Sequence, residues 1–119
     1  MKKYFLVFLL ITSISVFAGP NKFKEVDLRI MNHLYNAELV QADSLLKLQM
    51  NQQPDNPKYY VIQAHYHFYS RYFTQGLARD SILQLIINAS QKAITLAENM
   101  EESTEQKFYL GSAFGFSGC

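Results

Sequence analysis

A short tripeptide that recurs along this chain constrains its architecture more than any other feature. The residues "HLY" at 33–35 return as "HFY" at 67–69, a shift of 34 positions. At the same shift, three further apolar residues meet apolar partners: Val26 and Tyr60, Ile30 and Ala64, and Leu39 and Phe73. A fixed period of this size is typical of stacked helical units. The recurrence therefore predicts that the chain repeats one structural unit.

Apolar residues recur at helical spacing in four or five segments, and almost no stretch alternates as a strand would. The segments cover residues 22–35, 38–52, 57–73, 78–100 and 104–118. Asn56 can cap the third segment, and Pro57 suits its first helical position. Ser103 and Gln106 have the spacing of a capping box at the start of the last segment. We therefore expect an all-α fold of antiparallel helix pairs.

Small and large residues fall at positions that one known helical repeat uses for packing. Ala42-x3-Leu46 followed by Pro54 matches the second helix of a unit, and Leu110-Gly111-x2-Phe114 matches a first helix. This pattern resembles the tetratricopeptide repeat. The resemblance implies about two and a half helix-turn-helix units, stacked as a short α-solenoid. It also implies that the small residues let neighbouring helices approach closely.

The match to the repeat is degenerate in three places. Gln63 and His67 depart from the first-helix pattern. The interval from Ala64 to Gly111 is 47 residues, which is 13 more than the period. Glu101 stands where the proline after a second helix would recur. The chain is therefore expected to be tetratricopeptide-like rather than a regular array.

The last predicted helix is apolar and lacks a second helix to cover it. Its large apolar residues are Phe108, Tyr109, Leu110, Phe114 and Phe116. Solenoids normally finish with a polar capping unit, so an uncovered apolar end indicates a missing neighbour. We expect residues 19–119 to form a repeat domain that is incomplete at its C-terminus. Further sequence would cover this helix, or a partner would, including a second copy of the chain.

The first 18 residues have the layout of a secretory signal peptide. Lys2 and Lys3 precede an apolar run from Tyr4 to Phe17, and cleavage is expected after Ala18. An uncleaved anchor is the alternative, but the run has 14 residues, whereas a membrane-spanning helix needs about 20. Cleavage would leave no stable membrane anchor. The mature chain is then expected in the periplasm or outside the cell, and the short Lys-Lys start favours a bacterial source.

Charge and residue usage argue against several classes of site. The net charge is +1, which makes no electrostatic case for a nucleic-acid partner. His65 and His67 are two residues apart, so on a helix they point to different faces and do not form a metal-ligand pair. No nucleophile elbow or phosphate loop is present. We therefore expect no catalytic residue, no metal, no cofactor and no enzymatic activity.

The aromatic run "HYHFYSRYF" at residues 65–73 is the remaining candidate for a site. If Ala64 and its helical neighbours face the adjoining helices, the opposite side of this helix carries a stripe of six residues. These are Lys58, Val61, His65, Phe68, Tyr69 and Tyr72. A lysine at one end with amphipathic rings along it suits an extended peptide. The alternative is that these rings belong to the core, and the pattern alone does not separate the two.

These features together predict an exported tetratricopeptide-like scaffold that mediates protein–protein contacts and has no catalytic activity of its own. The alternative is the N-terminal helical domain of a larger secreted enzyme or envelope-assembly factor. Sequence beyond Cys119 would discriminate between them: further repeats favour the scaffold, and a different domain favours the alternative. The partner, the pathway and the oligomeric state are not specified by any residue pattern.

Overall fold

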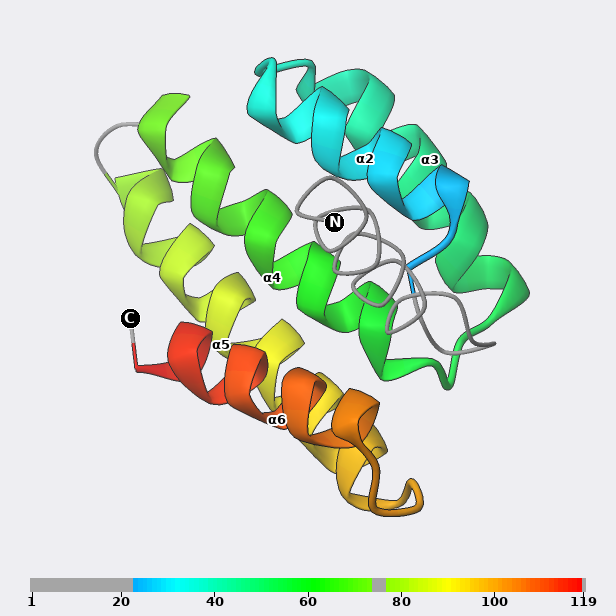
Figure 1. The fold of residues 1–119 in the computed structure, drawn as a ribbon. Helices are drawn as coiled ribbons and strands as arrows, with labels where there is room; N and C mark the ends of the chain where they lie inside the picture. Colours follow the sequence, from blue (N-terminus) through cyan, green and yellow to red (C-terminus); the bar gives the residue numbers. More distant parts are fainter. Residues whose placement is uncertain (1–22, 74–76, 119) are drawn as a thin grey trace, which may run out of the picture.

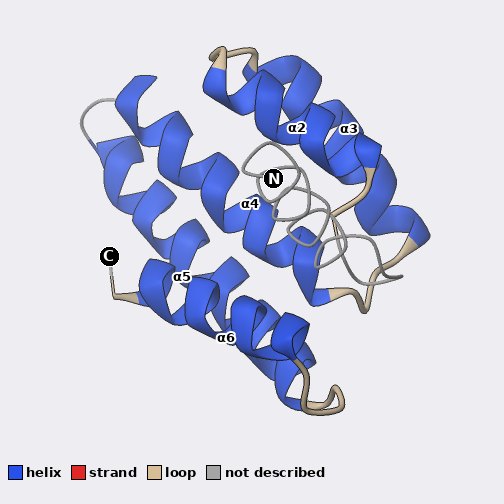
Figure 2. Cartoon of the chain, in the orientation of Figure 1, coloured by secondary structure: helices blue, strands red, loops and turns tan. Residues whose placement is uncertain are grey.

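The computed structural model describes residues 23–73 and 77–118, and within them every regular element is helical (Figure 2). The helices are α2 (Glu25–Tyr35), α3 (Leu39–Gln52), α4 (Pro57–Ser70), α5 (Leu77–Glu98) and α6 (Thr104–Ser117), with a short 3-10 helix η1 (Arg71–Phe73) after α4. Each helix packs against the next in the chain, in antiparallel order (Figure 1). The all-α prediction is confirmed. The predicted cleavage site at Ala18 lies outside the described residues.

Both predicted helix starts are present. Asn56 caps α4 with its side-chain oxygen, which accepts a backbone N–H at 3.1 Å. The Ser103 hydroxyl likewise accepts the backbone N–H of Gln106 at 3.1 Å. The side chain of Gln106 does not complete the capping box; its Nε2 instead donates to the carbonyls of Ala97 at 3.0 Å and Met100 at 3.2 Å. Gln106 therefore satisfies carbonyl groups at the end of α5 and ties α5 to α6.

Helix α4 lies between the α2–α3 pair and the α5–α6 pair, and it contacts all four helices (Figure 1). Two apolar clusters result. The first joins α2, α3 and α4 through Ile30, Leu34, Ala42, Leu46, Tyr59 and Ile62. The second joins α4, α5 and α6 through Val61, Ala93, Ala97, Tyr109 and Ala113. Since α4 contributes to both clusters, most of its surface is covered, and it is the helix around which the fold is organised.

Small residues mark the close helix approaches, as expected, except on α6. Ala42 and Ala64 are fully buried. The prediction for Gly111 is wrong: no atom lies within 4 Å of the place where a Cβ would stand, and Ala113 is the buried small residue of α6. The reason is that no described element covers the outer face of α6, where Phe114 is also 56% exposed. The expected apolar exposed face is present, and association through it stays a prediction.

Candidate functional site: an aromatic cavity between α2, α4 and α6

A cavity of about 290 Å³ lies between α2, α4 and α6. Each helix presents one face to it, with residues spaced by four positions. The lining residues are Met31 and Tyr35 on α2, Val61, Ile62 and His65 on α4, Phe108, Ser112 and Phe116 on α6, and Phe23 just before α2. Aromatic and aliphatic groups with few polar ones are typical of sites that bind apolar ligand groups.

Aromatic rings connect the three helices around this cavity. The His65 imidazole packs edge-on against Phe116, with ring centroids 5.0 Å apart. It also stacks on Tyr69 at 5.4 Å, and Tyr69 meets Tyr35 edge-on at 5.8 Å. Edge-on and offset contacts at these separations are favourable for aromatic pairs. The chain of rings therefore holds one wall of the cavity to α2 and α6 at the same time.

The cavity carries no charged side chain, and its polar side-chain groups are His65, Ser112 and the Tyr35 hydroxyl. Among the described residues, neither His65 nor Ser112 forms a hydrogen bond. Burial lowers the pKa of His65 below its ordinary value, so the imidazole is neutral at pH 7. A neutral, mostly apolar lining with two unused hydrogen-bonding groups fits an uncharged side chain better than an ion.

We expect the fold to lose stability as the pH falls from about 7 to about 5, in part through His65. Burial lowers the pKa of His65 in the folded chain. As the pH falls, the unfolded chain therefore binds a proton at a higher pH than the folded chain does. Acidification then favours unfolding, because the unfolded state binds more protons in this range. Urea titrations at both pH values measure the loss, which should be smaller in His65→Gln. An equal loss in that variant and the unchanged chain would exclude His65 as a cause.

The six residues predicted as a binding stripe differ in how far they are buried. Lys58 and Val61 are buried, with relative exposures of 0% and 4%. His65, Phe68 and Tyr69 are half-buried, and Tyr72 is exposed. Val61 and His65 line the cavity, and Tyr69 stacks on His65. The stripe is therefore not one open surface: its middle, Val61 and His65, lines the cavity, and exposure rises toward Tyr72 at its carboxyl-terminal end.

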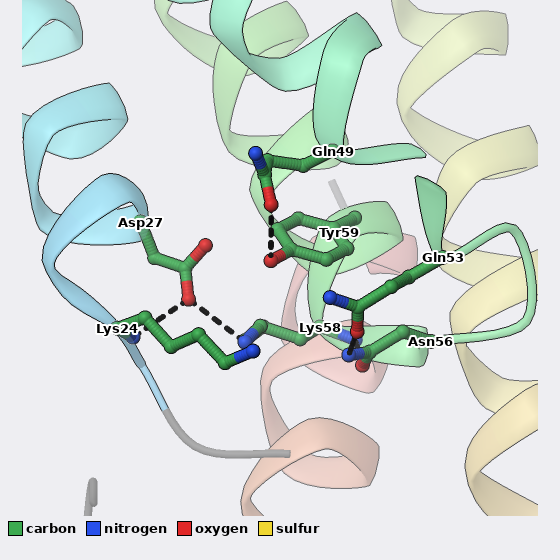
Figure 3. A network of polar contacts seen from close by, with 7 residues as sticks. All are labelled: Lys24, Asp27, Gln49, Gln53, Asn56, Lys58 and Tyr59. Carbon is green, nitrogen blue, oxygen red and sulfur yellow. Dashed lines mark hydrogen bonds and ion pairs between the residues drawn. The ribbon is translucent and has the colours of Figure 1, made fainter. Parts of the chain in front are cut away.

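Lys58 is withdrawn from the surface by an ion pair with Asp27 of α2 (Figure 3). Its Nζ lies 2.8 Å from Asp27 Oδ2, and both side chains are 0% exposed. The same Oδ2 accepts the backbone N–H of Lys24 at 2.8 Å, so Asp27 also caps the start of α2. The Lys58 ammonium further lies 4.8 Å from the centroid of the Tyr59 ring. Lys58 thus joins α4 to α2 and is not available to an extended peptide.

Further polar contacts lie beside this pair (Figure 3). The Tyr59 hydroxyl donates to Gln49 Oε1 at 3.1 Å and links α4 to α3. Burial, together with the nearby Asp27 carboxylate, raises the pKa of Tyr59 well above its ordinary value, so its hydroxyl remains a donor at neutral pH. On the loop before α4, Asn56 Nδ2 donates to Gln53 Oε1 at 2.9 Å. These contacts hold the start of α4 in place.

The residue pattern did not identify the cavity lining contributed by α2 and α6. No motif in the sequence places Tyr35, Phe108 and Phe116 in one site, although Phe108 and Phe116 belong to the apolar last helix. The available signal was their spacing: Phe108, Ser112 and Phe116 follow one another at four-residue intervals, as Met31 and Tyr35 do. Such spacing places residues on one helix face but does not say which faces meet.

Within residues 23–73 and 77–118, no group of three or more His, Cys, Asp or Glu side chains is placed to hold a metal ion. Across the same ranges, no helix has both the length and the apolar character needed to cross a membrane. Comparison of the chain with protein-family models, with curated proteins and with solved structures found no match. The cavity is therefore interpreted from its own geometry and chemistry.

Proposed function

We propose that this chain is an exported, tetratricopeptide-like scaffold that binds other proteins through the cavity between α2, α4 and α6. In this proposal α2 and α3 form one unit, α4 and α5 form the next, and α6 is the first helix of a third. The order of helix contacts supports it: α4 packs against its neighbours α3 and α5 and also against α2 and α6, the corresponding first helices.

The observation that carries the proposal is that equivalent repeat positions surround the cavity. A shift of 34 positions leads from Met31 and Tyr35 to His65 and Tyr69. A shift of 47, the interval from Ala64 to Gly111, leads from His65 and Tyr69 to Ser112 and Phe116. Five of these six residues line the cavity, and the sixth, Tyr69, stacks on His65. One surface repeated on the first helix of each unit, here α2, α4 and α6, is the arrangement that repeat proteins use to bind extended partners.

The lining indicates what part of a partner would enter. The cavity is uncharged and bordered by rings from three helices. An apolar or aromatic side chain of an extended segment would bury its surface there, which is the main favourable term in such contacts. His65 and Ser112 could then hydrogen-bond to the partner's backbone or to a polar group on that side chain.

Filling the cavity tests this proposal. Ser112→Leu adds a larger side chain on the cavity face of α6, whereas Ser44→Leu makes the same change at an exposed site on α3. Peptides selected from a displayed random library on the unchanged chain should bind Ser112→Leu about tenfold more weakly or worse, a loss of roughly 1.4 kcal/mol. Fluorescence polarisation measures the affinities, and circular dichroism checks that helicity is retained.

The matched control decides the outcome. The selected peptides should bind Ser44→Leu as tightly as the unchanged chain. If no peptide is enriched, or if the enriched peptides bind Ser112→Leu and Ser44→Leu equally, the cavity is not the binding site and the proposed function fails.

A further inference from the structure

Arg71, directly after α4, carries a cation that is held against aromatic rings. Its Cζ lies 4.2 Å from the centroid of the Phe68 ring and 5.4 Å from that of Tyr72. A guanidinium over a ring face is attracted by the ring's electron distribution and needs little further ordering when it binds. The side chain is therefore positioned in advance, rather than free to sample many rotamers.

The guanidinium has unused hydrogen-bonding capacity. Its Nε is buried and lacks a hydrogen-bond partner. Within the described part of the chain Arg71 forms no ion pair. Asp80, an exposed carboxylate in the first turn of α5, does not pair with it either. A partly buried cation without a carboxylate is costly unless an anion reaches it. This arrangement is complementary to a negatively charged group from outside.

Arg71 lies one aromatic ring away from the cavity. The Phe68 ring contacts both Arg71 and Phe116, and its centroid is 5.8 Å from that of Phe116. Phe116 is itself a lining residue of the cavity. The two separations together limit the distance from Arg71 Cζ to the Phe116 ring to about 10 Å, which is about three residues of extended chain.

We propose that the cavity and Arg71 form a two-part site for an extended protein segment, in which a large apolar side chain fills the cavity and an Asp or Glu within three residues pairs with Arg71. This inference rests on the proposed function and adds the charge of the partner to it. The uncharged cavity lining supplies apolar contact, and the guanidinium supplies a charge-assisted hydrogen bond that fixes the direction of the segment.

Two matched peptides test the inference on the full chain, namely acetyl-Phe-Gly-Asp-amide and acetyl-Phe-Gly-Asn-amide. They differ only in the charge of the last side chain. Binding is followed by chemical-shift changes in NMR titrations. The Asp peptide should bind about tenfold more tightly than the Asn peptide, as expected for a hydrogen bond to a charged group. This advantage should shrink as salt is raised, because salt screens the ion pair.

Two variants test whether Arg71 causes the tighter binding of the Asp peptide. Arg71→Gln should remove the preference, so that the Asp and Asn peptides bind this variant with equal affinity. Arg29→Gln, the same change at an exposed site on α2, should leave the preference intact. Equal binding of both peptides to the unchanged chain would overturn the inference while the proposed function stands. If neither peptide binds, the result counts against the cavity itself and so against both proposals.

Discussion

Replacing Lys58 with methionine is expected to lower the free energy of unfolding by about 3–5 kcal/mol. The variant leaves the Asp27 carboxylate 0% exposed without the ammonium that lies 2.8 Å away. An unpaired buried charge costs far more than the pair contributes, since the protein cannot solvate it. A loss of this size is a large share of the stability of a small domain. Urea unfolding followed by circular dichroism measures it.

Two further variants separate charge burial from loss of a side chain. Lys47→Met removes an equally close ion pair, 2.8 Å from Asp43, but the Lys47 side chain is 71% exposed; the loss should be far smaller than for Lys58→Met, because solvent screens an exposed pair. Combining Lys58→Met with Asp27→Asn removes both charges and keeps an acceptor for the Lys24 N–H. The double variant should recover most of the stability. If it remains as unstable as Lys58→Met, charge burial is not the cause.

Leu46→Ala is expected to cost about 2–5 kcal/mol, because it removes three carbons from the cluster between α2, α3 and α4 and leaves a void. Leu46 is 2% exposed and belongs to the same cluster as Ile30 and Tyr59. The lost contacts include those that hold α3 against α4, so the loss should appear as a lower midpoint in urea with little change in the slope of the transition.

Leu48→Ala is the matched control for this prediction, since it makes the same chemical change two residues away on α3. Leu48 is 50% exposed, so its truncation should change the free energy of unfolding by only about 0.5 kcal/mol. Comparable losses in the two variants would show that α3 does not pack through the Leu46 face, contrary to the structure.

Helix boundaries were predictable because their causes are local. Asn56 with Pro57, and Ser103 with its backbone partner three residues later, act within one turn of the chain. No information about distant residues is needed to place such caps. The reciprocal contact of Gln106 was not predictable in the same way. Its choice of Ala97 and Met100 carbonyls depends on where the end of α5 lies relative to α6.

The residue pattern predicted which residues of the stripe share a face of α4, but not how far each one is buried. Burial depends on the position of α4 among the other helices. A helix pattern says which residues share a face, but it does not say how many faces are covered. Because α4 is packed by four other helices, Lys58 and Val61 are buried, whereas His65 and Tyr69 are half-buried. The depth at which each residue of the stripe lies is therefore a property of the assembled fold.

The sequence by itself determined the helical composition, the helix starts and the 34-residue recurrence, because these depend on spacing and on contacts within a turn or two. Only the tertiary structure decided the rest. It paired Lys58 with Asp27, which is 31 positions away, and placed Tyr35, His65 and Phe116 around one cavity. The physical reason is that burial and charge pairing are set by which helix faces meet, and that depends on the packing of helices α2 to α6 together.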